Sequence, residues 1–472
     1  MRLKLVSTLA LAFAGWLAPA TATVASPPAV EASPELVGDE PDPEDDLLGE
    51  LVVEAKRRGQ LVLPRIAVLR PPDEDLTYLH DLLARDLELS GEFELVSVDA
   101  RPRFDDPVDA EAYAALGLEA VVTADVQRRP DGRFDLLVRV FLPAVGELAA
   151  WSKTVAVSPA EGRLAGHRLS DGVIGALTGT DGPFASRLVL VRTEGKGRKA
   201  YLVDADGKGL TPISPDEQLV VTATLDADAQ PLWAASEKSG AYRLYRAGVA
   251  EPLAVEPAGS IYGIALAPNG LDVALAIATD EAIQVFTGAL GAPLVAKTKL
   301  DFALTPTWTR DGKLVYAGIT GKRRSIYVGT KPISPPEVPA SSPTVCNHPD
   351  GPRVIYSVGL GKNTDLVASD LDGSDMARLT WSSGRNFAPA CSPDGRLVAF
   401  FSTRKKNGRA GLFLMRVDGR RPRRIHAAVG DVLFWARIPG RPAQIVTPTP
   451  EPAREPEPPS DEQKLPLSDA VP

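Results

Sequence analysis

The sequence predicts an α/β amino-terminal domain followed by an all-β six-bladed β-propeller. Three observations predict it: a short phrase that recurs along the second half of the chain, an α/β pattern before it, and one further strand after the last copy. Each copy reads as a strand, a tight turn and a second strand, with turn glycines at Gly270, Gly312, Gly351 and Gly395. The intervals between these glycines are 42, 39 and 44 residues. A period of about 40 residues with several short strands per repeat is typical of a β-propeller.

The turn chemistry explains the recurring phrase. In Pro393-Asp394-Gly395 the proline fixes φ at the first corner, the aspartate bonds its own backbone, and the glycine supplies the positive φ that closes the turn. Two weaker copies complete the count of blades. Leu225–Ser236 has Ala229 at the glycine position, and Val432–Arg441 has Gly440 there.

The ring needs one more strand to close. Between Arg187 and Ser214 the pattern supplies a second, third and fourth strand but no first. The simplest closure is that Asp431–Ile438 provides this innermost strand, which latches the ring with its own C-terminal segment. Such a latch removes open sheet edges that would otherwise favour aggregation.

The segment before the repeats alternates strands and helices, and it ends at the hinge Asp181–Pro183. Its helices are predicted from apolar residues three or four positions apart and from terminal glycines. The expected strands are Pro64–Pro71, Phe93–Asp99, Leu118–Arg129, Phe134–Pro143 and Ala149–Ser158, and the expected helices are Leu76–Gly91, Asp109–Gly117 and about 159–177.

The two ends of the chain predict export and flexible extensions. Residues 1–25 have the pattern of a signal peptide, with Arg2 and Lys4 before an apolar run, Leu5–Leu17, that is too short to span a bilayer. We therefore expect a mature protein outside the cytoplasm without a transmembrane span, and the family resemblance described below implies the periplasm. Residues 26–49 are expected to form an acidic disordered arm and residues 441–472 a proline-rich disordered tail.

Charge is unevenly distributed along the chain, whose net charge is −9. Ten acidic residues and no basic one lie between Glu31 and Glu54. Basic clusters occur instead in the repeats, at Lys322–Arg324, Arg404–Lys406 and Arg420–Arg424. We interpret them as solvated hairpin loops and expect no nucleic-acid partner, since an exported acidic protein meets little nucleic acid.

The two cysteines, Cys346 and Cys391, fall in the innermost strands of neighbouring predicted blades. In an oxidising compartment they can form a disulfide. The alternative is that both are small buried hydrophobic residues.

The pattern contains no constellation that would predict catalysis. There is no Gly-x-Ser-x-Gly elbow of the kind that would identify an α/β-hydrolase. The histidines His80, His167, His348 and His426 have no metal-ligand spacing, so each is expected at the surface or as a cap. We predict no enzyme and no catalytic, cofactor-binding or metal-binding residues.

The order of elements resembles the TolB family of the Tol-Pal envelope system. The resemblance rests on DLELSGEFELV, AYAALGLEAVVTADV and HRLSDGVIGALTG, followed directly by RLVLVRTEGKGRKAYLVDADGKGLTPIS, and covers about Leu51 to Gly440. It implies a domain at residues 50–182 and a six-bladed propeller at 183–440, closed by the C-terminal strand. Related propellers can hold calcium in the channel, but no ligands are assigned here.

The resemblance also implies partners. The propeller face would bind a Pal-like peptidoglycan-associated lipoprotein, and an arm near Glu50–Ala55 would engage a TolA-like inner-membrane protein, in a monomer that supports outer-membrane integrity and constriction at cell division. Ser260 stands where a close relative would carry a histidine. The loops of this face are Ser214–Val220, Glu256–Tyr262, Leu300–Thr305, Glu337–Ser342 and Trp381–Phe387, and the candidate partner-binding residues are Ser260, Tyr262, Leu304, Trp381 and Phe387. The alternative is an exported propeller that binds a small ligand such as a glycan, or an enzyme with a site at the channel mouth.

Overall fold

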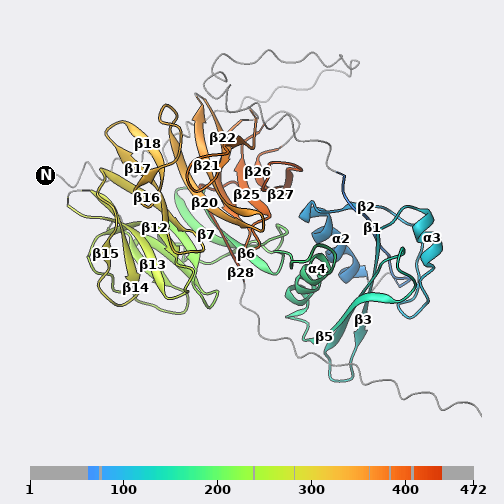
Figure 1. Cartoon of the computed structure of the whole chain (residues 1–472). Coiled ribbons are helices and arrows are strands. Elements are labelled where there is room, and N and C mark those ends of the chain that lie inside the picture. Colours follow the sequence, from blue (N-terminus) through green and yellow to red (C-terminus); the bar gives the residue numbers. More distant parts are fainter. Residues whose placement is uncertain are drawn as a thin grey trace, which may run out of the picture.

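The computed structural model describes residues 62–73, 77–237, 240–280, 282–360, 362–381, 384–404 and 409–437. The expected signal peptide, acidic arm, arm segment Glu50–Ala55 and proline-rich tail lie outside these residues. Figure 1 shows an α/β domain, coloured blue to teal, beside a ring of strands coloured green to red.

The α/β domain is a five-stranded sheet with the order β2-β1-β3-β4-β5. Helices α2 and α4 contact each other and the strands β3, β4 and β5. The elements are β1 (Arg65–Val68), α2 (Thr77–Ser90), β2 (Glu94–Leu95), α3 (Ala110–Ala115), β3 (Ala120–Arg128), β4 (Phe134–Phe141), β5 (Ala149–Val157) and α4 (Gly162–Thr178).

The apolar spacing noted in the sequence places the core of this domain. Leu79, Leu83 and Leu87 of α2 are buried against Val122 and Val138 of the sheet. β1 and β2 are both shorter than expected, with four and two residues, and their pairing covers just two residue pairs.

The remaining strands form six antiparallel units among the described residues. The first unit combines β28 (Val432–Arg437) with β6 (Ser186–Glu194), β7 (Gly197–Asp204) and β8 (Thr211–Pro212). The second contains β9 (Gln218–Leu225), β10 (Pro231–Glu237) and β11 (Arg243–Arg246), and the third β12 (Ser260–Leu266), β13 (Asp272–Ala278), β14 (Ile283–Ala289) and β15 (Val295–Ala296).

The last three units follow the same meander. The fourth contains β16 (Phe302–Trp308), β17 (Leu314–Thr320), β18 (Arg323–Val328) and β19 (Lys331–Pro332). The fifth contains β20 (Ala340–His348), β21 (Gly351–Leu360), β22 (Asn363–Ser369) and β23 (Ala377–Arg378), and the sixth β24 (Asn386–Cys391), β25 (Leu397–Ser402), β26 (Gly411–Arg416) and β27 (Arg423–His426).

The first strands of the six units, which we call the inner strands, close into a ring. β9, β12, β16, β20, β24 and β28 each contact the next in this order, and β28 contacts β9. β28 pairs with β6 from Val432 opposite Val191 to Arg437 opposite Ser186. This is the place expected for the missing first strand, and Trp435 is buried there, with its indole N–H donating to Ser186 Oγ at 2.7 Å.

The tight turns after the inner strands behave as their sequences indicate. Gly270, Gly312 and Gly395 have φ values of 71°, 79° and 79°, and Ala229, at the glycine position of a weaker copy, also has a positive φ of 58°. A side chain is excluded at Gly395 for a second reason. A Cβ there would lie 2.3 Å from the carbonyl carbon of Asn347 in the neighbouring unit.

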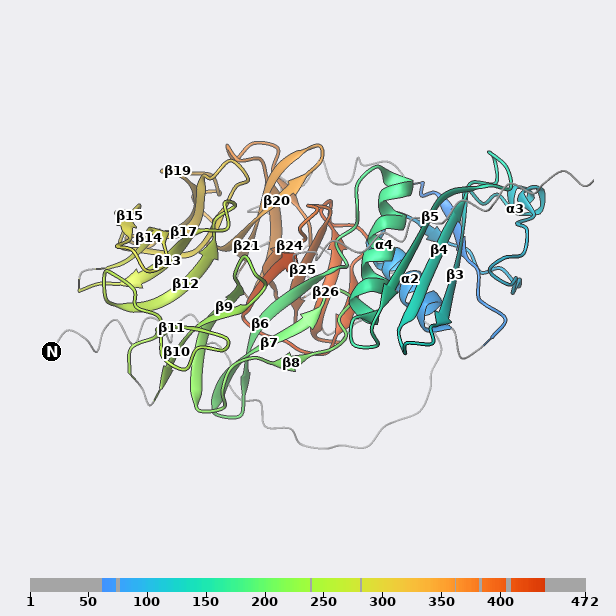
Figure 2. The same ribbon diagram turned by 90° about the horizontal axis from the view of Figure 1, so that it is seen from below.

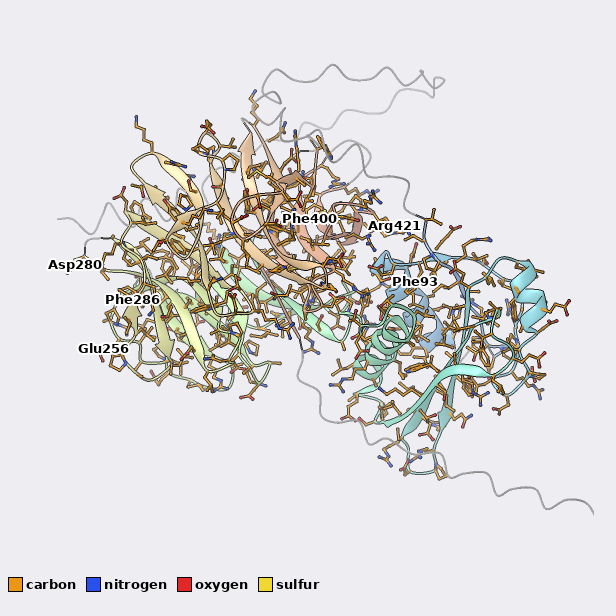
Figure 3. All side chains as sticks on the ribbon, in the orientation of Figure 1. Phe93, Glu256, Asp280, Phe286, Phe400 and Arg421 are labelled. Atoms are coloured by element: carbon orange, nitrogen blue, oxygen red, sulfur yellow. A yellow bond between two sulfur atoms is a disulfide. The ribbon has the colours of Figure 1, made fainter. Side chains whose placement is uncertain are left out.

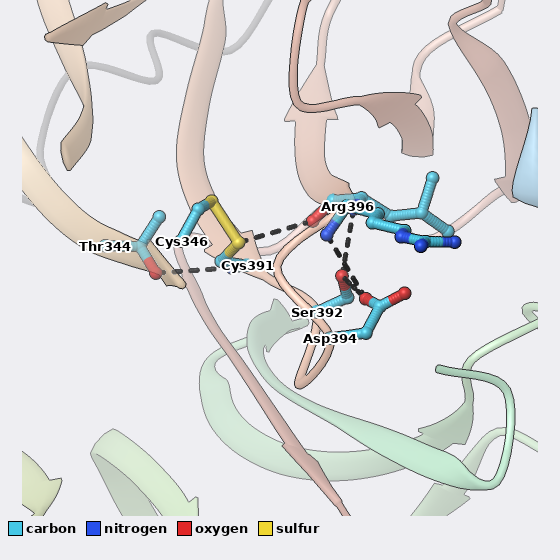
Figure 4. Close-up of a disulfide and its surroundings, with 7 residues drawn as sticks. Thr344, Cys346, Cys391, Ser392, Asp394 and Arg396 are labelled. Atoms are coloured by element: carbon cyan, nitrogen blue, oxygen red, sulfur yellow. Dashed lines mark hydrogen bonds between the residues drawn. A yellow bond between two sulfur atoms is a disulfide. The ribbon is translucent and has the colours of Figure 1, made fainter. Parts of the chain in front are cut away.

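A disulfide joins two adjacent inner strands. Cys346 of β20 and Cys391 of β24 are bonded, with their Cα atoms 5.3 Å apart. Figure 4 shows the bond beside the turn that carries Asp394 and Arg396. The structure thus decides between the two interpretations of these cysteines in favour of the bridge.

Helices α2 and α4 lie between the α/β sheet and the ring (Figures 1 and 2). One buried apolar cluster includes residues of both parts, among them Leu83, Leu169, Leu188 and Phe401. The connection between the two parts is fixed because the carboxylate of Asp171 accepts hydrogen bonds from the backbone N–H groups of Phe184 and Ala185.

Candidate binding face

The ring has two distinct ends, and the α/β domain occupies one of them. In each unit the inner strand runs from the loop that enters it to the tight turn that follows it. Arg396, in the turn after β24, donates to the Thr178 hydroxyl at 2.8 Å. Arg163 of α4 binds Asp204, the last residue of β7, and Asp206, in the turn that follows, at 2.7 Å each. Because both turns lie at the same end of their units, the loops that enter the inner strands lie at the opposite end, which we call the entry face.

A cavity of about 200 Å³ is lined by all six inner strands. Among the described residues that line it, most polar side chains carry hydroxyl groups and none is a histidine or a glutamate. Asp431 lines it as well, but this carboxylate forms an ion pair with Arg198. Hydroxyl-bearing lining residues are Thr222, Tyr262, Thr305, Thr307, Ser342 and Thr344.

The inner strands bend at equivalent positions. Register shifts interrupt β16, β20 and β24, and Thr305, Ser342 and Ala388 there have φ values of 46°, 52° and 50°. Each of the three precedes a proline, although proline disfavours the helical regions of φ/ψ space for the residue before it. A bulge of this kind bends the strand, so these residues set the shape of the cavity wall.

Tyr262 lies on the wall of the cavity. It is half-buried, and its ring packs edge to face against Tyr242 with the centroids 5.4 Å apart. Burial raises the pKa of the Tyr262 hydroxyl. Ser260 accepts a hydrogen bond from the backbone N–H of Tyr242 at 3.3 Å, so it anchors the same contact.

Leu304 and Phe387 are only partly available to a partner. Leu304 packs against the apolar cluster that contains Tyr316. Phe387 packs on the core beside Phe401, with ring centroids 6.0 Å apart. Neither residue lines the central cavity. Of the five candidate residues, only Tyr262 lines the central cavity.

Trp381 is the most exposed of the five candidates, with 42% of its surface accessible. Its ring lies 4.9 Å from the guanidinium carbon of Arg378, which is itself buried. Arg378 Nε lies 3.1 Å from a carboxylate oxygen of the fully buried Asp365, and the side-chain amide of Asn386 donates to Asp365 at 3.0 Å. An exposed tryptophan is thus held in place by a buried ionic network, an arrangement that lowers the entropy lost on binding.

A buried charged cluster lies between the two parts of the molecule, where sequence spacing gave no signal. His167 Nδ1 of α4 lies 2.7 Å from Asp86 Oδ2 of α2, and Asp206 lies close to both. Burial lowers the pKa of His167, but the charge and hydrogen bond of Asp86 together with the charge of Asp206 raise the pKa overall; burial also raises the pKa of Asp86. Both shifts favour the protonated form of the pair. The expectation that His167 is a surface or capping residue is wrong.

This cluster is the one group of acidic, histidine and cysteine side chains among the described residues that is close enough to share a metal ion. Arg163 and Arg85 already lie 2.7 and 3.3 Å from the carboxylate of Asp206. Two guanidinium groups at this distance supply the positive charge that a cation would bring. We therefore interpret the cluster as an ionic joint between the two parts.

The basic cluster at Arg420–Arg424 also belongs to this joint. Arg421 donates to the carbonyl of Phe93 at 3.2 Å, and Arg423 lies 2.6 Å from Glu88. Figure 3 shows Arg421 and Phe93 facing each other across the boundary. The interpretation of this cluster as a solvated loop is wrong. Lys322, between β17 and β18, and Arg404, directly after β25, instead lie between second and third strands, which places them on the entry face.

These features define a class of protein: a closed ring of antiparallel units with an axial cavity, joined rigidly to a small α/β domain. Comparisons with known proteins specify it further. Residues 59–142 match the family model described as the TolB amino-terminal domain. The chain is 35% identical over 133 residues to a Tol-Pal system protein TolB of Thiobacillus denitrificans, which is 28% of this chain and 31% of that protein.

A second curated relative, the Tol-Pal system protein TolB of Polaromonas naphthalenivorans, is 29% identical over 187 residues, or 38% of this chain and 42% of that protein. The chain thus matches about a third of the length of the curated relatives. The crystal structure of TolB from Acinetobacter baumannii aligns with 80% of this chain and 97% of its own, with a TM-score of 0.65 and 20% identity. The resemblance to the TolB family is confirmed, and the β-propeller expected from the repeat agrees with this neighbour.

Among the described residues, no helix combines the length and the apolar character that crossing a bilayer requires.

Proposed function

We propose that this chain is a periplasmic, non-enzymatic component of a Tol-Pal system, built as an α/β domain at residues 50–182 and a six-bladed propeller at 183–440. The entry face binds a Pal-like lipoprotein, and the segment near Glu50–Ala55 engages a TolA-like inner-membrane protein. Through these contacts a monomer would support outer-membrane integrity and constriction at division. The names of the curated relatives and the amino-terminal match support this proposal.

The proposal rests on the difference between the two ends of the ring. One end is covered by the α/β domain through ion pairs such as Arg163 with Asp204 and Asp206. The entry face carries Trp381, exposed yet fixed on a buried guanidinium. Preorganised aromatic side chains dominate the energetics of protein interfaces. A face of short loops around one mouth allows a partner to bury a standard interface of roughly 1,600 Å² without rearranging the strands.

The test is a titration of the cognate Pal-like lipoprotein's soluble domain with the wild-type chain and with Trp381→Glu. We expect the substitution to weaken binding about 10-fold or more, the range of aromatic hot spots. Leu271→Glu is the matched control, because Leu271 is 75% exposed in the turn after β12, at the opposite end of the ring. Equal affinity of both variants, with unchanged melting temperatures, would move the site elsewhere.

A second candidate function rests on the hydroxyl-lined cavity of about 200 Å³. Hydroxyl groups, including that of Tyr262, can form hydrogen bonds with a small polar ligand such as a glycan. Two results together would favour this function. The intact chain would not bind the lipoprotein, and it would bind a peptidoglycan fragment saturably, with the binding abolished by Tyr262→Ala.

A further inference from the structure

Arg404 lies on the entry face with an unusual combination of burial and charge. Its guanidinium carbon lies 4.4 Å from the ring centroid of Phe413, and it donates through Nε to Ser402 Oγ at 2.9 Å. It also contacts the side-chain oxygen of Asn386 at 3.4 Å. No carboxylate of the described residues lies within ion-pair distance of Arg404; its hydrogen-bond acceptors are neutral groups.

The surroundings of Arg404 leave its charge incompletely compensated. Burial lowers the pKa of Arg404 below its ordinary value, and the charge of Asp365 opposes this shift. Asp365, however, is fully buried and bound directly to Arg378. A half-buried cation that has no carboxylate partner has a desolvation cost in the free protein. Binding of an anion offsets this cost through charge-assisted hydrogen bonds.

Arg385 adds a second cation to the same corner. Its guanidinium carbon lies 5.3 Å from the ring centroid of Phe387, and the backbone carbonyl of Arg385 accepts a hydrogen bond from Thr403 at 2.9 Å. That bond ties the loop before β24 to the end of β25, so Arg385 and Arg404 extend from neighbouring, bonded segments. Stacking on aromatic rings orients both guanidinium groups without neutralising them.

We propose that Arg404 and Arg385 form a carboxylate-binding corner of the entry face that receives an acidic side chain of the protein partner. This inference rests on the proposed function for the partner's identity, but not for the chemistry of the corner. Planar guanidinium groups match carboxylate geometry, and the exposed ring of Trp381, which like Arg385 precedes β24, supplies apolar contact on the same face. The basic hairpin Lys322–Arg324 gives the same face further positive charge for attracting an acidic partner.

The partner, and not the acidic segment Glu31–Glu54 of the same chain, is the occupant that the geometry favours. The described part of the chain begins at Val62, in the α/β domain, which packs on the opposite end of the ring from the corner. A partner bound to the entry face meets the corner directly.

The experiment titrates the soluble domain of the cognate lipoprotein against Arg404→Gln, Arg385→Gln and the matched control Lys299→Gln at two salt concentrations. Lys299 is an exposed cation of the entry face outside the corner. We expect Arg404→Gln to weaken binding about 10- to 100-fold, with a smaller salt dependence, and Lys299→Gln to weaken it less than about 3-fold. Arg404→Lys, which keeps the charge but not the planar fork, should fall between them. If Arg404→Gln and Lys299→Gln weaken binding of the lipoprotein equally, the carboxylate-binding corner is wrong, while the proposed function still stands.

A second titration keeps the two ideas separable. A hexaglutamate peptide should bind the wild-type chain weakly, hexaglutamine should not, and Arg404→Gln should abolish the difference. If the lipoprotein fails to bind but this peptide behaves as expected, the partner is wrong and the corner stands. If deletion of residues 26–49 strengthens binding of hexaglutamate and of the lipoprotein about 10-fold or more in the wild-type chain but not in Arg404→Gln, the corner is occupied by the chain's own acidic segment and the proposal fails.

Discussion

Gly395 and Gly312 offer a matched test of how the units of the ring pack together. Both glycines occupy the tight turn after an inner strand, both have φ of 79°, and both donate to the carbonyl three residues earlier, at 2.9 and 3.0 Å. They differ in their surroundings. A Cβ at Gly312 meets no atom within 4 Å, whereas one at Gly395 would lie 2.3 Å from the carbonyl carbon of Asn347 and 2.5 Å from the backbone nitrogen of His348.

The geometry sets the expected magnitudes. Alanine in the left-handed region costs about 1 to 2 kcal/mol, and this cost applies to both Gly312→Ala and Gly395→Ala. At Gly395 the methyl group must also displace the backbone of β20, and overpacking of a well-packed site costs about 1 to 3 kcal/mol more. We therefore expect the free energy of unfolding to fall by about 1 to 2 kcal/mol in the first variant and about 2 to 5 kcal/mol in the second.

Urea unfolding followed by tryptophan fluorescence measures both values, provided that the dependence on urea concentration is unchanged between variants. Oxidising conditions are kept throughout, since Gly395 is close to Cys391 in sequence. Equal destabilisation by the two substitutions would show that the turn after β24 does not pack against β20 as described, and would refute the reasoning.

Three further predictions follow from buried features. Trp435→Ala should cost about 3 to 5 kcal/mol of unfolding free energy because the side chain is 6% exposed, whereas Trp381→Ala should cost less than about 1 kcal/mol; comparable losses would contradict the latch formed by β28. Replacing Cys346 and Cys391 together by alanine should cost up to about 4 kcal/mol, as expected for a crosslink between residues 45 positions apart, and a reductant should then have no further effect on the midpoint. Because the folded pKa of His167 is raised, its contribution to stability is fully present below the unfolded pKa of about 6.5 and is lost as pH rises through the folded value. His167→Gln should remove this pH dependence, and a variant that retains it would disprove the assignment.

Local chemistry explains how much of the fold could be predicted. The turn glycines and the apolar spacing of α2 depend on neighbours in sequence, so the elements around them were predictable to within a few residues. Even Ala229 has the positive φ that its place in the repeat predicts. β2 was overestimated because strand length depends on the partner strand, and β1 offers it only two residue pairs.

The charged contacts were beyond the sequence because they join residues far apart along the chain. His167 and Asp86 are separated by 81 positions, and Arg421 and Phe93 by 328. No spacing rule relates such pairs, so the sequence could only predict that His167 and Arg421, as polar residues, would be exposed. The same reason applies to the entry face: Trp381 was a candidate as an aromatic loop residue, but its support by Arg378 and the role of Arg404 appear only when β22, β23 and β25 are placed together.

The pairing of β28 with β6 also bears on how the molecule is made. Residues that face each other across this pair, such as Trp435 and Leu188, lie at the two ends of the ring's sequence. During synthesis from the N-terminus, every other unit can form its internal strand pairs before the last strand exists. The first unit must wait with one edge of β6 unpaired, and contacts of such long sequence separation form slowly. The ring is therefore closed late in folding. In a chain truncated a few residues short of Arg437, part of the edge of β6 would stay unpaired, and we expect such a chain to be more accessible to proteases.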